Sequence, residues 1–246
     1  IHPMQRLTVD QFRFFVEHFL RCGYHFISLD DIIRKESVKK RNIFVTFDDG
    51  YFSSLLALPV LEEYSIPATF FITTNNVVEG RLFWWDALYR ERRKRGTPEK
   101  EIFQEERLLH KKRHEEILSY LTGEFGKDVL TQTSDLNRPL TPSELKDLSE
   151  NRLITIGNHN AEHANITLYA DGEIESQLAQ AQEALTDITG NKPNIISYPH
   201  GHYDQRVAEI SKSVGLSLGI TTEPRLTKLP LGRNGRNAMM LGRFGF

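Results

Sequence analysis

Ile43-Phe44-Val45-Thr46-Phe47-Asp48-Asp49-Gly50 is an apolar and β-branched run that ends in two carboxylates and a glycine. Such a run predicts a short buried strand that finishes at Phe47, with Asp48 and Asp49 at its carboxyl end. Two acids beside an apolar strand are costly unless they bind a cation or share a hydrogen-bond network. An ordinary Asp-Asp-Gly turn is the competing interpretation, and the pair alone does not decide between them.

Strands and helices alternate on both sides of this run. Further strands are expected where apolar or β-branched residues cluster, at 24–29, 67–73, 153–156, 195–198 and 216–220. Helical spacing of apolar residues predicts a helix between Thr8 and Gly23 and others over 28–33, 53–64, 141–151, 172–189 and 205–214. This alternation is typical of a parallel α/β fold. One domain over residues 1–246 accounts for it, and the expected architecture is a barrel with its chemistry at the carboxyl ends of the strands.

Residues 86–128 interrupt the alternation with charged side chains at helical spacing. Basic residues come first, at 90–95, and residues of both signs follow. A basic cluster can hold a phosphate, but mixed charges at helical spacing are more typical of a solvated helix face. We therefore expect a helical insertion on the surface and infer no partner from it.

The composition of the chain excludes several classes of protein. Its 246 residues (28.4 kDa), 39% hydrophobic and 26% charged with a mean hydropathy of −0.43, are typical of a globular protein and not of a collagen-like or disordered one. A formal net charge of −2 gives no global cationic field for nucleic acid. No apolar run approaches the roughly 18–20 residues that a membrane-spanning helix needs.

The single cysteine and the first residue bear on redox chemistry and location. Cys22 has no partner for an intrachain disulfide and cannot build a cysteine-rich zinc site. Within an apolar helical pattern it is expected to fill the core. The chain starts at Ile1 without a methionine, so we expect a processed or truncated N-terminus. Cellular location and oligomeric state are left open.

Two more polar clusters follow predicted strands. In Gly157-Asn158-His159-Asn160-Ala161-Glu162-His163 the two imidazoles are four residues apart, which is one helical turn if the segment coils. Two histidines and one carboxylate suit Zn²⁺ or another divalent ion and leave positions open for water and substrate. The third cluster, residues 197–204, contains a Pro and a Gly that favour a tight turn able to direct a backbone N–H into a pocket. A purely structural turn is the alternative there.

The three clusters, in this order, resemble the motifs of the polysaccharide deacetylases of the NodB-homology type, carbohydrate esterase family four. In that family the first Asp of the first motif is the general base and the second is a metal ligand, which implies these roles for Asp48 and Asp49. Both histidines of the second motif bind the metal, which implies that His159 and His163 are ligands. The third motif usually ends in Pro-Tyr-Gly, and here His200 takes the place of the Tyr. The resemblance covers most of the chain apart from the charged insertion.

Aromatic residues near the motifs are candidates for binding a sugar. The segments Phe83-Trp84-Trp85-Asp86 and Leu241-Gly242-Arg243-Phe244 are similar to segments of members thought to act on surface polysaccharides or exopolysaccharides. Flat apolar faces suit the C–H face of a sugar ring, so the two tryptophans are expected to form a stacking wall, with core packing as the alternative. Tyr51 and Tyr198 adjoin motif residues and are expected to line the same pocket.

The resemblance implies a deformed (β/α) barrel of about seven strands and removal of an acetyl group from an N-acetylated sugar. One divalent ion, expected to be Zn²⁺, would polarise the amide carbonyl and lower the pKa of a bound water. Asp48 would take the proton during attack, and the backbone N–H of His200 would help to stabilise the oxyanion. The expected partner is an N-acetylated polysaccharide or oligosaccharide, not nucleic acid. The family usually has a strand ahead of the position of Thr8, which implies that a segment precedes Ile1.

Two departures from the family pattern affect the assigned roles. Many relatives carry an Arg in the third motif that orients the base, whereas this stretch has none, and Arg243 is expected to take its place. Many relatives also have a late general-acid histidine, whereas no histidine follows His202. His200, His202 and Asp48 itself are therefore all candidates for returning the proton.

Two alternative functions are consistent with these residues. A related hydrolase could act on a small non-sugar amide or a cyclic ureide, as some relatives resembling allantoinase do. A protein without activity could instead bind carbohydrate through a degenerate site, which the missing third-motif Arg and late His would explain. Acetate release from acetylated oligosaccharides separates both alternatives from a carbohydrate deacetylase.

Overall fold

A computed structural model describes residues 7–34, 39–229, 231 and 238–245; Ile1, where the expected truncation falls, lies outside these ranges. The described part contains seven strands and ten α-helices. The strands are β1 (His25–Phe26), β2 (Asn42–Ile43), β3 (Val45–Phe47), β4 (Ala68–Ile72), β5 (Ile154–Asn158), β6 (Ile195–Ser197) and β7 (Leu218–Ile220). The helices are α1 (Val9–Arg21), α2 (Leu29–Arg34), α3 (Leu58–Glu63), α4 (Thr74–Glu79), α5 (Trp84–Lys94), α6 (Glu99–Leu109), α7 (His114–Phe125), α8 (Pro142–Ser149), α9 (Asp171–Thr189) and α10 (Gln205–Ser213). Four short 3₁₀ turns join them, at η1 (Phe52–Ala57), η2 (Asp135–Asn137), η3 (Ile166–Leu168) and η4 (Pro199–Gly201).

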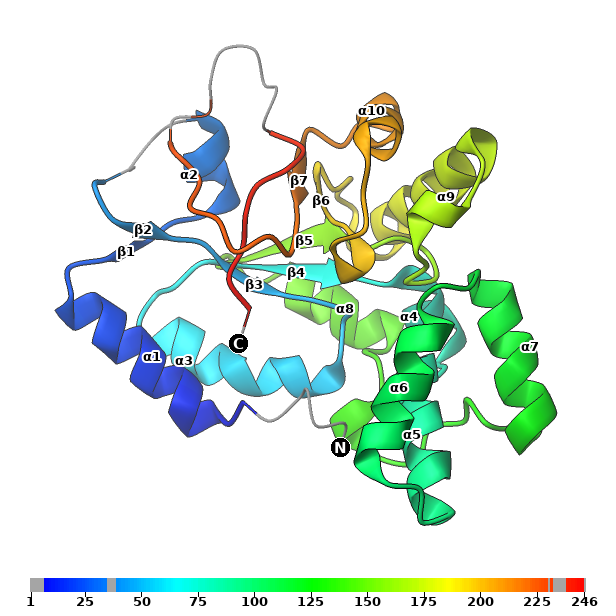
Figure 1. The fold of residues 1–246 in the computed structure, drawn as a ribbon. Coiled ribbons are helices and arrows are strands. Elements are labelled where there is room, and N and C mark those ends of the chain that lie inside the picture. The colour runs from blue at the N-terminus through cyan, green and yellow to red at the C-terminus, as the bar shows by residue number, and fades with distance from the viewer. Residues whose placement is uncertain (1–6, 35–38, 230, 232–237, 246) are drawn as a thin grey trace.

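A parallel sheet of five strands, in the order β3-β4-β5-β6-β7, forms the centre of the fold. The sheet curls into a half-barrel, around which α8 packs on α9 and α9 packs on α10 (Figure 1). The prediction of a deformed α/β barrel of about seven strands is confirmed for the described residues. The remaining strands, β1 and β2, pair in a separate parallel ladder, because the chain leaves that ladder after Ile43 and enters the main sheet at Val45.

Burial explains why β4, β6 and β7 are mostly apolar and carry no charged residue. All five residues of β4 and all three residues of β6 and of β7 are buried. Strands covered on both faces cannot alternate apolar and polar residues, since each face packs against other parts of the protein. The polar residues therefore gather where the strands end.

Local sequence signals place several helix boundaries. Thr8 begins α1 and Thr141 begins α8, each through a side-chain oxygen that accepts from the backbone N–H three residues later. Gly190 ends α9 in the left-handed conformation at φ 77°. The helix expected over 53–64 is wrong in its first half, which is the 3₁₀ turn η1. Pro59 has no N–H and would collide with a carbonyl one turn earlier, so α3 starts only where Pro59 lies in its first turn.

Helices α5, α6 and α7 form a group beside the sheet (Figure 1). We call these three helices the α5–α7 group. They occupy the segment expected to be a charged insertion, and ion pairs such as Arg95 to Glu124 (2.6 Å) do lie on its surface. The group also has an apolar core of its own, with Ile102 and Leu121 fully enclosed, and this core extends to Tyr51 beside the first motif. The group therefore packs against the end of the main sheet where the motifs lie.

Two further expectations concern exposure. Cys22 does not fill the core: it caps the end of α1 and is exposed. The buried residue of α1 is Val16 instead. No helix in the described ranges is long and apolar enough to cross a membrane.

Candidate metal centre

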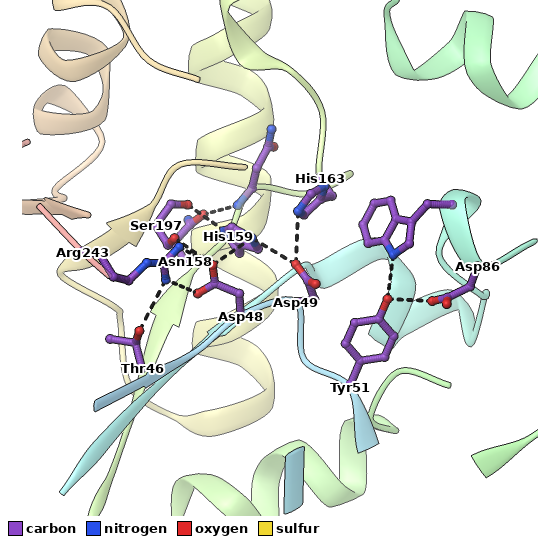
Figure 2. A network of polar contacts seen from close by, with 12 residues as sticks. Thr46, Asp48, Asp49, Tyr51, Asp86, Asn158, His159, His163, Ser197 and Arg243 are labelled. Atoms are coloured by element: carbon purple, nitrogen blue, oxygen red, sulfur yellow. Dashed lines mark hydrogen bonds and ion pairs between the residues drawn. The ribbon is translucent and has the colours of Figure 1, made fainter. Parts of the chain in front are cut away.

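The polar clusters meet because their strands are parallel neighbours. Asp48 and Asp49 follow β3, His159 follows β5, and Ser197 is the last residue of β6. Carboxyl ends of parallel strands lie at the same edge of a sheet, which is where sites form in barrels of this type. Residues more than a hundred positions apart in the sequence are thus brought into contact (Figure 2).

Asp49, His159 and His163 form a compact set of three ligand atoms. The Oδ1 atom of Asp49 lies 3.1 Å from Nε2 of His159 and 3.1 Å from Nε2 of His163. All three ligand atoms lie within 4.8 Å of one another, so one cation can contact each of them. One carboxylate and two imidazoles, with both imidazoles buried, fit a divalent metal ion that keeps open positions. We call these residues the triad.

The backbone of the triad differs from the expected helical turn. Residues 159–163 form a loop, and His163 adopts a left-handed conformation at φ 51°. Asp49 is also left-handed, at φ 74°. Non-glycine residues in this region cost about 1–3 kcal/mol each, and such strain is concentrated at functional sites. The four-residue spacing therefore brings the imidazoles together by a bent loop, not by one face of a helix.

His159 is oriented by the strand next to its own. Its Nδ1 lies 2.7 Å from the carbonyl oxygen of Ser197, which as an acceptor places the proton on Nδ1 and leaves Nε2 free to face Asp49. Burial opposes the charge on this ring, but Asp48 and Asp49 outweigh it and raise its pKa. Burial also opposes the charge of Asp49, yet the two histidines hold the pKa of that carboxyl far below its usual range. The site thus concentrates negative charge, which a cation bound there would neutralise in place of a proton.

Asp48 lies beside the triad and is held by Arg243. Its Oδ2 is 3.9 Å from Nε2 of His159, farther than Asp49, and it accepts a hydrogen bond from the Ser197 hydroxyl at 3.3 Å. Arg243 donates from Nη1 to Oδ1 and from Nη2 to Oδ2, each at 2.7 Å (Figure 2). Burial would raise the pKa of Asp48, but Arg243 and His159 lower it overall. Asp48 is therefore an ionised carboxylate positioned to accept a proton.

The segment that carries Arg243 pairs with the end of β7, and this pairing brings Arg243 to Asp48. Leu241 forms a parallel bridge with Ile220 at the end of β7, and the Arg243 N–H donates to the carbonyl of Glu223 at 2.9 Å. The last described segment thus runs along the end of the half-barrel and points the guanidinium at the first motif. The catalytic role expected for Arg243 stays a prediction.

The α5–α7 group supports the other side of the triad. The ring of Trp85 lies 4.5 Å from that of His163 between centroids. The Trp85 Nε1–H donates to the Tyr51 hydroxyl at 2.8 Å, and that hydroxyl donates to Oδ2 of Asp86 at 2.6 Å. Burial and the neighbouring Asp86 carboxylate raise the pKa of Tyr51 well above its ordinary value, so it remains a donor. Trp85 and Tyr51 therefore pack behind a metal ligand.

Trp84 and Tyr198 are almost fully enclosed. Trp84 is 3% exposed and packs on His110 at 4.9 Å between ring centroids, while Tyr198 is 0% exposed and stacks on Tyr203 at 5.1 Å. Both tryptophans nevertheless line a cavity of about 50 Å³ beside His163. Its other walls include Arg81, His114 and Glu162. The sugar-stacking wall stays a prediction, and the packing of Trp84 supports the alternative that the sequence left open.

His200 lies on the same side of the triad as Trp85. The third motif turns sharply here, with His200 at φ 56° and Gly201 at φ 73°. The ring of His200 is 4.4 Å from that of His163 between centroids. Burial, followed by the neighbouring imidazoles, lowers the pKa of His200 well below its ordinary value. The catalytic assignment of His200 stays a prediction.

Sequence reasoning missed His110, which lies at the end of α6. Its ring is 3.9 Å from that of His200 between centroids, and its Nε2 is 3.3 Å from Oε1 of Glu106. In the sequence, His110 belongs to a stretch whose mixed charges indicated a solvated face. The four-residue spacing from Glu106 was the available signal, and it is common on exposed helices.

Comparison with known proteins identifies the family. The polysaccharide deacetylase family matches residues 35–219 of this chain, well over half of its length. The chain therefore belongs to the polysaccharide deacetylase family, and the resemblance drawn from its motifs is confirmed. YxkH of Bacillus subtilis (strain 168) is 26% identical over 85 residues, which are 35% of this chain and 30% of YxkH.

Three solved structures share the fold. Polysaccharide deacetylase BC0361 of Bacillus cereus has a TM-score of 0.64 at 20% identity, covering 97% of this chain and 57% of that one. Deacetylase PplD of Streptococcus pyogenes, solved in complex with acetate, has a TM-score of 0.64 at 18% identity, covering 96% and 80%. IcaB of Ammonifex degensii has a TM-score of 0.67 at 16% identity, covering 98% and 84%. This chain thus spans little more than half of BC0361 and under a third of YxkH.

Proposed function

We propose that this chain is a metal-dependent carbohydrate N-deacetylase, which hydrolyses the N-acetyl group of a sugar in a polysaccharide or oligosaccharide and releases acetate. The observation that carries the proposal is the triad with an ionised, separately held carboxylate beside it. The three ligands alone would also fit a metal site with a purely structural role. The added Asp48 lies 3.9 Å from His159 and is held by Arg243, and it supplies the base that hydrolysis requires.

Each residue of the site has a separate role in the reaction. Asp49, His159 and His163 would hold one divalent ion, for which Zn²⁺ is favoured by two imidazoles and one carboxylate. When bound, such an ion acts as a Lewis acid and activates water at neutral pH. Asp48 takes the proton of the attacking water, and Arg243 keeps Asp48 ionised and in place. The backbone N–H of His200 is the candidate for stabilising the oxyanion.

Substrate recognition is assigned to the side of the triad that faces the α5–α7 group. Trp84 and Trp85 line the cavity beside His163, and the carboxylate of Glu162 and the guanidinium of Arg81 add polar contacts suited to sugar hydroxyls. PplD is a deacetylase and BC0361 is a polysaccharide deacetylase, and this supports a glycan as the substrate class.

Acetate release from N-acetylated chito-oligosaccharides tests the proposal. Wild type supplied with Zn²⁺ should release acetate, and Asp48→Asn should keep its metal and lose turnover by about 10²–10⁴-fold, the usual contribution of a general base. Activity only on small amides or a cyclic ureide would refute the glycan substrate. Glycan binding without acetate release at full metal loading would show a degenerate binding protein instead.

A further inference from the structure

Amide hydrolysis needs a proton at the leaving nitrogen, because an amine anion is a very poor leaving group. Asp48 lies with Arg243 at one end of the triad, and the triad residue His163 is at the other end (Figure 2). The sequence has no histidine after His202, so the last described segment supplies no imidazole. The remaining candidates for a proton donor lie on the side of His163.

Four imidazoles outside the triad lie on that side, and one of them, His114, lines the cavity beside His163. His200 contacts the ring of His163, while His110 and His202 lie 3.9 Å and 6.0 Å from His200 between ring centroids. Within the described ranges, His110 alone of these four has a carboxylate as hydrogen-bond partner, at 3.3 Å from Glu106. A carboxylate on one ring nitrogen holds an imidazole in a fixed orientation, as in the arrangement of a catalytic proton donor.

The second nitrogen of His110 is available for transfer. Its Nδ1 is buried and has no hydrogen-bond partner among the described residues, whereas its Nε2 faces Glu106. The side chain is 21% exposed, so the ring is packed but reaches solvent, from which a spent donor can recover a proton. Trp84 packs against the ring in an edge-on contact, 4.9 Å away between centroids.

We infer that His110, carried to the site by the α5–α7 group and oriented by Glu106, is the proton donor to the leaving nitrogen. The inference rests on the proposed deacetylase function. As the C–N bond breaks, its electron pair goes to nitrogen, which takes the proton from His110; acetic acid and a free amine result. Asp48 has gained one proton from water and His110 has lost one, and exchange with solvent resets both groups. The charged helices are then part of the active site and not a surface addition.

A leaving-group comparison tests this role with His110→Gln. Acetanilide and an acetylated chito-oligosaccharide need a proton on the leaving nitrogen, whereas 4-nitrophenyl acetate releases 4-nitrophenolate, which is a stable anion without a proton. His110→Gln should lower kcat on both amides by about 10²-fold or more and change metal-dependent ester hydrolysis by less than about threefold. Zn²⁺ affinity, measured by calorimetry, should not change. His25→Gln on β1 is the matched control and should match wild type on all three substrates.

Glu106→Gln provides a second variant that keeps the ring, and it should lower amide turnover about tenfold while sparing the ester. Equal losses on amides and ester, or no loss on either, would overturn the donor assignment. A loss confined to amides in His202→Gln, with none in His110→Gln, would assign the role to His202 and also overturn it. If wild type cleaves acetanilide and the ester but no acetylated glycan, the proposed function fails, and His110 is still judged on the acetanilide-to-ester ratio.

Discussion

Replacing Arg243 should slow deacetylation by disturbing Asp48. The guanidinium donates two hydrogen bonds of 2.7 Å to this carboxylate. Hydrogen bonds to charged groups contribute about 1.5–3 kcal/mol each. The side chains of Arg243 and Asp48 are 20% and 26% exposed, so water replaces part of what Arg243→Gln removes. A net loss of about 2–3 kcal/mol in the transition state corresponds to about 30- to 150-fold in kcat/KM.

The dependence of kcat/KM on pH separates the effect of the Arg243 charge from the effect of its paired hydrogen bonds. Burial raises the pKa of Asp48, and Arg243 is the leading group that lowers it. Without Arg243 that pKa rises, so the fall in activity on acidification should begin at a higher pH in Arg243→Gln. Arg243→Lys keeps the charge but loses the paired hydrogen bonds. Its pH profile should therefore shift less than that of Arg243→Gln, and its kcat/KM should level off below the wild-type value. Acetate release between pH 4 and 9, at full metal loading, measures both; a profile equal to that of wild type would refute the role of Arg243.

Asp86→Asn should weaken Zn²⁺ binding by about 10- to 100-fold, because Asp86 holds Tyr51 and Tyr51 holds Trp85 against the triad. Isothermal titration of the metal-free protein measures this. Glu144→Gln should reduce the loss of stability in acid. Arg138 chiefly lowers the pKa of Glu144 from 4.5 to about 2, so the ionised form stabilises the fold above pH 4.5 and this stability disappears as pH falls towards 2. Urea unfolding at pH 7 and pH 3 should show a difference between the proteins of about 1 kcal/mol at pH 7 that shrinks at pH 3.

Each of these variants has a matched control. Tyr120→Phe removes a hydroxyl elsewhere in the α5–α7 group and should leave Zn²⁺ affinity at the wild-type value. Equal affinity in Asp86→Asn and wild type would show that the buried chain of hydrogen bonds does not support the triad. For Glu144, Glu150→Gln changes an exposed acid next to the same helix, and the same pH response in both variants would contradict the assignment.

Much of the fold follows from the sequence because its signals are local. The runs that became β3, β4 and β6 are too apolar for the surface, and Thr141 and Gly190 mark helix ends by hydrogen bonds within a few residues. Pro59 misled the prediction because the first turn of a helix tolerates proline, and the sequence does not say where that turn begins. Parallel strands then bring the motif residues to one edge, so the triad could be predicted without knowing the loop that bends His163 towards Asp49.

The other contacts of the site could not be predicted, because they join residues that are far apart in the sequence. Nothing near Asp86 in the sequence indicates that its carboxylate accepts a hydrogen bond from Tyr51, 35 positions away. His110 was hidden for the same reason, since its contact with His200 joins segments 90 residues apart and its neighbours in the chain are charged. A helix with charges of both signs can have one face in solvent and another face against a site. Its composition alone does not distinguish the two faces.

Metal content measured together with acetate release tests the central claim most directly. Wild type and His163→Ala are each equilibrated with Zn²⁺, freed of excess, analysed for bound metal, and assayed on acetylated chito-oligosaccharides. The account predicts one Zn²⁺ per wild-type chain with acetate release, and the loss of both in His163→Ala. Acetate release at the wild-type rate by His163→Ala without bound metal would contradict it.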